Sequence, residues 1–294
     1  MNTYRTFDPE ALDLRQWHPY MIGSFFPRPI AWVSTLDEKG TRNLAPFSYF
    51  GVFSSKPPVV GFSPSTSART GGAKDTLRNV QVIPEAVIHL VPYNLAHKMN
   101  ITTGEYAPEA DEMALAGLET LPSLRVRPPR IAGTPVQAEC RVREIIPLGN
   151  NPGAGQLVLA EVLLLHIDEA VLDANGLPDP QKMDIIARLG GFWYARIRAE
   201  NLFWMKQPRN PEEVVTWQEL PQDLRESTIL SAAEIGHLLA FRPAWIHEAA
   251  SWPLPKDPVT LHTQMKALLP HDAPAAWVLY KNAERYAPNT LNPD

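Results

Sequence analysis

One stretch of the sequence, residues 63–76, combines side chains that suit a phosphate group. Its first half is rich in hydroxyls and contains one arginine: Ser63, Ser65, Thr66, Ser67 and Arg69. Lys74, Asp75 and Thr76 then open a segment with helical spacing, and the unpaired N–H groups and positive dipole end of a helix N-terminus favour an anion. A structural alternative is that Asp75 and Thr76 only cap the helix while Arg69 and Lys74 are solvated. Residue chemistry alone favours this alternative.

Other common chemistries lack their motifs. The glycines of residues 149–155 are wrongly spaced for a dinucleotide-binding loop, and residues 70–76 lack the upstream Gly and the Gly-Lys-Thr of a P-loop. Residues 61–65 lack the closing Gly of a nucleophile elbow, and the eight histidines have no metal-type spacing. We therefore expect no catalytic side chain and no metal site, and a cofactor that carries the chemistry.

Composition narrows the class of protein. Of 294 residues, 45% are hydrophobic and 20% are charged, which is typical of a globular chain. A net charge of -5 argues against nucleic acid as the main partner. The single cysteine, Cys140, cannot form an internal disulfide, and no secretory or membrane-spanning apolar run is visible. We expect a cytoplasmic protein without a membrane partner.

The elements that would position these residues are mainly short strands, as the 30 prolines also suggest. Four ranges are β-prone: 30–36, 47–54, 59–63 and 86–91. Alternating residues in 136–146 and 156–168 flank a compact turn and predict a long antiparallel hairpin. Short helices are expected at 74–82, at 94–101 with Asn94 as N-cap, and near 180–189. Together these elements predict a mainly antiparallel barrel with short helical insertions.

The sequence pattern changes after about residue 201. Residues 207–211 are typical of a linker, and 231–240 and 275–287 have helical apolar spacing. We therefore predict two parts, 1–200 and a helical C-terminal extension, 201–294. The extension contains four tryptophans: Trp217, Trp245, Trp252 and Trp277. Packing within their own part is the expected role, and capping of a cofactor cleft or contact with another subunit are the alternatives.

Three segments in order resemble the flavin reductase family: PRPIAWVST (27–35), NLAPFSYF (43–50) and KDTLRN (74–79). PPRI (128–131), Glu139-Cys140 and RLGGFWY (188–194) are further similar features. The resemblance covers about the first two thirds of the chain. It implies an FMN-binding split β-barrel, antiparallel and Greek-key-like, in a homodimer with flavin near the subunit interface.

With this family context, the functional interpretation of the phosphate loop is favoured, and it assigns the FMN phosphate to Ser63, Arg69, Lys74, Asp75 and Thr76. The resemblance also implies that backbone groups of Ala45, Pro46, Phe47 and Ser48 meet the polar edge of the flavin ring, since Pro46 removes a ladder donor. Side-chain candidates for the same edge are Ser34, Thr35, Asn43 and Ser48, although a structural role is as plausible for Asn43.

The remaining candidates concern the flat ring. Trp32 is the preferred packing partner, although an aromatic residue in a strand more often belongs to the core. Gly191 allows close backbone approach to a ligand or to a partner strand. Lys98 lies on a segment that in similar proteins can approach the phosphate or the ring, and an exposed helix face explains it equally well.

The resemblance implies an FMN-dependent oxidoreductase that takes hydride from NAD(P)H and passes electrons to an acceptor. The alternative is a non-enzymatic, flavoredoxin-like electron carrier. A third interpretation is a split barrel whose C-terminal helices serve as a binding or assembly module. The C-terminal extension departs from the family pattern, because similar proteins end soon after the GGFWY segment.

Overall fold

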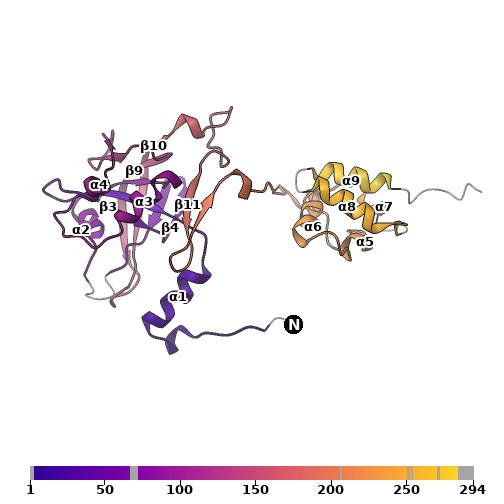
Figure 1. The fold of residues 1–294 in the computed structure, drawn as a ribbon, viewed down its shortest axis with the longest axis horizontal. Coiled ribbons are helices and arrows are strands. Elements are labelled where there is room, and N and C mark those ends of the chain that lie inside the picture. The colour runs from indigo at the N-terminus through magenta and orange to yellow at the C-terminus, as the bar shows by residue number, and fades with distance from the viewer. Residues whose placement is uncertain are drawn as a thin grey trace, which may run out of the picture. The chain divides into compact units, whose positions relative to one another are not determined.

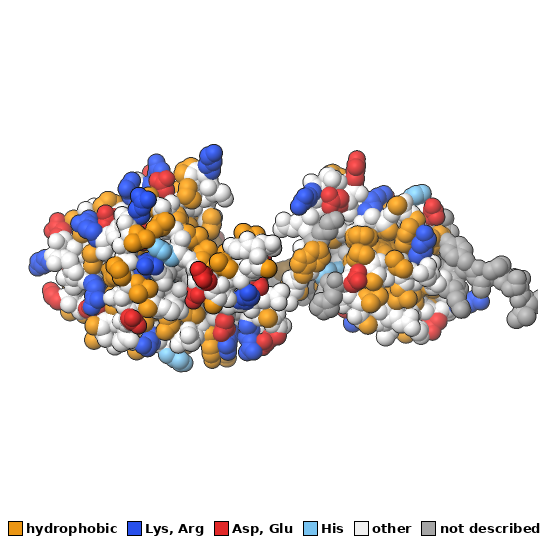
Figure 2. Space-filling view, turned by 90° about the horizontal axis from the view of Figure 1, so that it is seen from above, with side chains coloured by type: hydrophobic (Ala, Val, Ile, Leu, Met, Phe, Trp, Pro, Cys, Tyr) orange, Lys and Arg blue, Asp and Glu red, His pale blue; other side chains and the backbone are white. Residues whose placement is uncertain are grey.

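The structure is a computed structural model that describes residues 3–66, 72–205, 207–249, 252, 254–269 and 272–283. The chain divides into two compact units, with the boundary between Leu202 and Phe203. The first unit is built mainly of strands and the second of helices (Figure 1). On the face drawn in Figure 2, acidic and basic side chains are interspersed over the first unit. No helix of the described residues is long and apolar enough to cross a membrane.

The strands of the first unit are β1 (Arg28–Pro29), β2 (Ala31–Leu36), β3 (Arg42–Phe47), β4 (Phe50–Ser55), β5 (Pro58–Phe62), β6 (Glu85–His89), β7 (Thr120–Leu121), β8 (Arg130–Ile131), β9 (Val136–Pro147), β10 (Gln156–Ile167), β11 (Ile185–Arg188) and β12 (Tyr194–Ile197). Its helices are α1 (Leu14–Ser24), α2 (Asp75–Val82), α3 (Ala96–Ile101) and α4 (Glu112–Leu115). Seven strands form one antiparallel sheet in the order β3-β2-β6-β9-β10-β5-β4. A three-stranded sheet, β1-β11-β12, and the pair β7-β8 complete the unit.

Buried side chains lie on both faces of the seven-stranded sheet. Successive side chains of a strand point to opposite sides, so one strand can contribute to two clusters. On β2, Ala31 and Val33 belong to one buried cluster, which helix α2 covers with Leu77 and Val80. Trp32 belongs to the other cluster, which α3 and α4 cover with Met99 and Met113. Phe47 of β3 and Phe62 of β5 come from near opposite ends of the strand order and pack together in the first cluster. The sheet therefore curls around that cluster as a barrel, and α3 and α4 cover part of its outer face.

Helix α1 packs only weakly on the rest of the first unit. Asp13 and Gln16 form a capping box at its start, and none of its residues is buried. At its other end, the Arg28 guanidinium donates to the carbonyls of Ile22 and Phe25. Close backbone contact adds to this attachment, because a Cβ on Gly190 would lie 2.8 Å from the Gly23 Cα. Sequence patterns did not predict this helix.

Most of the predicted elements are confirmed. The antiparallel hairpin consists of β9 and β10, with irregularities between Leu159 and Ala160 and between Val162 and Leu164. The prediction of a helix near residues 180–189 is wrong, because Ile185–Arg188 is strand β11, paired with β1 and β12. Asn94 is not an N-cap, since it lies inside a 3₁₀ turn, Tyr93–Leu95, that precedes α3. The predicted strand 47–54 is interrupted at Ser48 and Tyr49, between β3 and β4.

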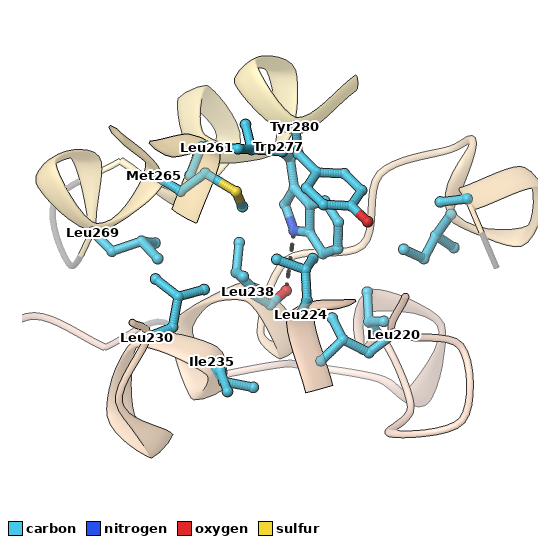
Figure 3. Packing of buried hydrophobic residues seen from close by; sticks show 14 residues of the cluster. Leu220, Leu224, Leu230, Ile235, Leu238, Leu261, Met265, Leu269, Trp277 and Tyr280 are labelled. Atoms are coloured by element: carbon cyan, nitrogen blue, oxygen red, sulfur yellow. Dashed lines mark hydrogen bonds between the residues drawn. The ribbon is translucent and has the colours of Figure 1, made fainter. Parts of the chain in front are cut away.

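The second unit has its own hydrophobic core (Figure 3). Its helices are α5 (Gln222–Arg225), α6 (Ala232–Leu239), α7 (Ile246–Ala249), α8 (Pro258–Leu268) and α9 (Ala273–Asn282). Trp277 is fully buried at its centre and donates from Nε1 to the Leu238 carbonyl at 3.1 Å. Trp245 stacks on Trp252 with ring centroids 5.1 Å apart. Trp217 is the exception to the expected packing, because 49% of it is exposed.

Candidate functional site

A cavity of about 340 Å³ lies where the N-terminus of α2 meets strand β3 and the segment after α3. This volume is within the range of small-molecule sites. Six residues predicted from the sequence line it: Asn43, Ala45, Pro46, Lys74, Asp75 and Thr76. Residues that sequence reasoning did not single out form the rest of the wall: Gly72, Ala73, Arg78, Thr102, Thr103, Gly104, Glu105, Tyr106, Pro108 and Glu112.

The first turn of α2 faces this cavity, and no side chain of the described residues caps it. Lys74 is the N-cap residue, and its side chain cannot accept a hydrogen bond. The carboxylate of Asp75 pairs with Arg78, and the Thr76 hydroxyl accepts a bond from Asn43. The alternative in which Asp75 and Thr76 only cap the helix therefore does not describe this structure. The uncapped N–H groups and the helix dipole make this end of α2 suited to an anion.

Lys74 supplies a positive charge at the same place. Its ammonium lies 6.0 Å from the centroid of the Phe47 ring, and among the described residues it forms no ion pair with a carboxylate. Its charge is thus available to a ligand. Arg69, the other predicted cation of the phosphate loop, lies outside the described residues.

In and behind the cavity wall, four buried polar side chains connect α2 to strands β2 and β3. The Asn43 amide donates to the hydroxyls of Thr35 at 3.1 Å and Thr76 at 2.9 Å. The Asn79 amide donates to Thr35 at 3.0 Å. Because all four residues are buried, these side chains fix the position of α2 and are occupied with one another. Asn79 belongs to the KDTLRN motif, but sequence reasoning gave it no role.

Glu112 is a further wall residue that sequence reasoning missed. Its carboxylate accepts a hydrogen bond from the Leu44 N–H at 3.0 Å, and the residue is only 7% exposed. Burial, aided by the nearby Asp111 charge, raises the pKa of Glu112 above its ordinary value, although its hydrogen bonds oppose this effect. Nothing in the local sequence marks Glu112, since its burial depends on contact between α4 and β3.

The predicted ring edge is partly in the cavity. Ala45 and Pro46 are half-buried wall residues in the middle of β3. Pro46 lies opposite Trp32 in the β2–β3 register and has no N–H to donate to that strand. Phe47, in contrast, is core: it is 6% exposed and packs on Phe62, with ring centroids 5.5 Å apart.

Trp32 and Ser34 also point into the protein interior. Both are fully buried. Trp32 donates from Nε1 to the Thr102 hydroxyl at 2.9 Å, and Ser34 donates to the Pro129 carbonyl at 2.6 Å. Trp32 therefore has no ring face open to a ligand, but it holds Thr102, a wall residue, in place.

Besides Trp32, Ser34, Thr35 and Phe47, four more predicted residues are not part of the cavity lining. Ser48 is 3.4 Å from Arg28 Nε, and Lys98 donates to the Gly117 carbonyl at 2.6 Å. Ser63 is buried against the β9–β10 turn, where a Cβ on Gly155 would lie 2.7 Å from its hydroxyl oxygen. Gly191, with φ +56°, forms the β11–β12 turn. In the described part of the chain, no three acidic, histidine or cysteine side chains are grouped as a metal site.

Comparisons with known proteins identify the family of the first unit. A family model described as "Flavin reductase like domain" matches residues 22–182. An uncharacterized protein of Halalkalibacterium halodurans, BH2278, is 32% identical over 191 residues, which are 64% of this chain and 90% of the relative.

Two solved structures are similar to the first two thirds of the chain. Nitrilotriacetate monooxygenase component B from Bacillus cereus has a TM-score of 0.65 at 27% identity, covering 69% of this chain and 100% of that one. A flavin reductase with a split barrel domain from Shewanella frigidimarina has a TM-score of 0.59 at 19% identity, which supports the fold alone. It covers 70% of this chain and all of that one.

Proposed function

The chain belongs to the flavin reductase-like family, whose fold is the split β-barrel, and on this premise we propose that it binds FMN at the N-terminus of α2 and reduces it with NAD(P)H. The family itself comprises flavin-related oxidoreductases. The proposal of FMN as the ligand rests on one cavity. It brings together the N-terminus of α2, the Lys74 ammonium, which pairs with no described carboxylate, and Ala45 and Pro46 of β3. FMN needs an anion site and a polar ring edge, and this cavity offers both.

In this proposal, the phosphate is held by the first-turn N–H groups of α2 and by Lys74. The sequence assigns Arg69 to the same phosphate, and this residue lies outside the described part of the chain. Thr35, Asn43 and Thr76 act as positioning residues: their buried hydrogen bonds hold α2 against the sheet, so that the N–H groups are oriented before the ligand arrives. This role for Thr76 replaces the direct phosphate contact expected from the sequence.

The ring edge meets the backbone of Ala45 and Pro46, whose half-buried groups border the cavity. When bound, FMN supplies the redox chemistry, because its N5 accepts a hydride from C4 of a nicotinamide. The chain contributes no nucleophile and no covalent step. Its residues bind and orient the flavin, and positioning and electrostatics account for the rate that the protein adds.

The test is an absorbance spectrum of the full-length protein with FMN, followed by anaerobic titration with NADH and with NADPH. We expect a protein that binds FMN and bleaches on addition of one of the two nucleotides. Failure to bind FMN would overturn the proposal. Binding without bleaching by either nucleotide would instead support the flavoredoxin-like carrier.

We further propose a homodimer. The support is apolar surface in the first unit: Phe25, Phe26 and Trp193 are each more than half exposed, and α1 buries none of its residues. Exposed aromatic groups of this size are typical of interaction sites. Sedimentation should give twice the mass of the chain, and Trp193→Lys should lower it. A monomer at all concentrations would contradict the proposal.

A further inference from the structure

A second cavity, of about 570 Å³, lies in the first unit between α3, the 3₁₀ turn before it and the β11–β12 hairpin. Aromatic and apolar side chains line much of it, among them Tyr93, Met99, Phe192 and Tyr194. Thr103 lines this cavity and also the one at the N-terminus of α2. A molecule in the second cavity would therefore lie next to a flavin in the first.

The two arginines that line this cavity, Arg188 and Arg196, differ in their ion pairing. Arg196 is neutralised by Asp184, which accepts two hydrogen bonds from it at 2.6 and 2.7 Å. Arg188 forms no ion pair with a described carboxylate; one of its N–H groups donates to the Gly191 carbonyl at 2.6 Å. The described lining of the cavity contains no Asp or Glu. Arg188 thus leaves an uncompensated positive charge at the cavity.

A second arginine, Arg28, adds to the positive charge beside Arg188. Arg28 is the register partner of Arg188 in the β1–β11 pair, so both side chains lie on the same face of the small sheet. Like charges directly opposite each other on neighbouring strands are destabilising. Arg28 donates to carbonyls and to Ser48, and to no described carboxylate. An anion bound beside Arg188 would relieve this repulsion.

The walls of the cavity favour a flat ring. The Arg188 guanidinium lies 4.5 Å from the centroid of the Tyr194 ring, and that of Arg196 lies 3.8 Å from the Tyr93 ring. A planar aromatic molecule can stack on such surfaces. The remaining N–H groups of Arg188 match a carboxylate, which guanidinium binds in a two-bond fork.

We propose that the second cavity binds a planar aromatic carboxylate, with Arg188 as the residue that binds its acid group. The inference rests on the proposed function, because it gives the chemical class of a second substrate beside FMN. The reduced nicotinamide ring of NAD(P)H is neutral and carries no acid group on the ring, so it offers Arg188 no charge to pair with.

The test uses the fluorescent acid 2-naphthoate and its neutral amide, 2-naphthamide, titrated into the full-length protein with and without FMN. We expect the acid to bind about tenfold more tightly than the amide. Arg188→Gln should weaken binding of the acid about tenfold and leave binding of the amide unchanged. Arg188→Lys keeps the charge but loses the two-bond fork, so it should retain part of the preference for the acid. Arg143→Gln is the matched control, because it removes the same charge from the exposed Arg143–Glu161 pair on the β9–β10 hairpin.

Equal binding of acid and amide, or equal losses in Arg188→Gln and Arg143→Gln, would overturn the proposal. A rise in the KM for NADH in Arg188→Gln, with 2-naphthoate binding unchanged, would assign the cavity to the nicotinamide nucleotide and also overturn it. Charge-dependent binding of 2-naphthoate to a protein that does not bind FMN would support this inference while the proposed function fails.

Discussion

Replacement of His89 by Gln should remove a large part of the protein's sensitivity to acid. His89 is fully buried on β6. Its Nε2 accepts a hydrogen bond from the Ile131 N–H at 3.0 Å, so the proton of the neutral ring is on Nδ1, which donates to the Trp32 carbonyl at 2.7 Å. Pro46, opposite Trp32 on β3, has no N–H for that carbonyl. The imidazole therefore joins β2, β6 and β8 only in its neutral form.

The magnitude follows from the pKa of His89, which burial lowers from its ordinary 6.5 to about 4. A base whose pKa is depressed in the folded state favours folding above its unfolded pKa, and this contribution is lost as the pH falls. The loss extends from pH 6.5 to about 4. This window of about 2.5 pH units corresponds to about 3 kcal/mol, because protonation would leave the Ile131 N–H facing a second donor.

The assay is urea unfolding of the wild type and of His89→Gln between about pH 7 and about pH 4.5. Gln is neutral throughout this range and retains one donor and one acceptor. We expect the free energy of unfolding of the variant to lie about 1 to 2 kcal/mol below that of the wild type at neutral pH, and to fall less steeply with acid. His89→Leu, which leaves two buried backbone groups without partners, should cost about 2 to 6 kcal/mol. Parallel pH profiles of the wild type and His89→Gln would refute the reasoning.

Three further predictions concern the candidate site and its support. Lys74→Met should weaken FMN binding about tenfold, measured by quenching of flavin fluorescence, whereas the same change at the exposed Lys39 should have no effect. Glu112→Gln keeps the hydrogen-bond acceptor for the Leu44 N–H but removes a negative charge from the cavity wall, so FMN should bind about threefold more tightly. This gain should appear only above the raised pKa of Glu112, and titration of the protein with FMN at several pH values checks it. Gly190→Ala places a Cβ 2.8 Å from the Gly23 backbone and should lower the free energy of unfolding by about 1 to 3 kcal/mol, measured in urea; an unchanged midpoint would show that α1 is not attached there.

The position of the candidate anion site, the cavity at the start of α2, could be predicted because its signals are local. Hydroxyls, a lysine and a helix start are adjacent in residues 63–76, and the structure places Lys74 at the N-cap of α2. The roles of single side chains were not predictable in the same way. Thr76 and Trp32 have suitable chemistry for a ligand, yet both are buried against partners distant in sequence, Asn43 and Thr102. Only tertiary packing decides whether such a group faces a cavity or the core.

Errors in secondary structure have a similar origin. Ile185–Arg188 is a short apolar run that fits a helix or a strand equally well by pattern, and its pairing with Arg28 and Pro29 decides for a strand. Glu112 was missed for a related reason: its sequence neighbourhood is that of an ordinary helix start, with Asp111 as the N-cap. Its place in the cavity wall depends on the hydrogen bond from the Leu44 N–H, which is 68 residues away in the sequence.

The two cavities are linked through the end of α3, and this link explains why a fully buried Trp32 still matters for the site. Its indole N–H donates to the Thr102 hydroxyl, which in turn donates to the Met99 carbonyl in the last turn of α3. Thr102 lines the first cavity, and its neighbour Thr103 lines both. The wall shared by the two cavities is thus attached to the central strand β2 by a buried hydrogen bond, and β2 is held at the same residue by His89. A rigid sheet that fixes such a wall lets the surrounding loops vary without changing the spacing between the two cavities.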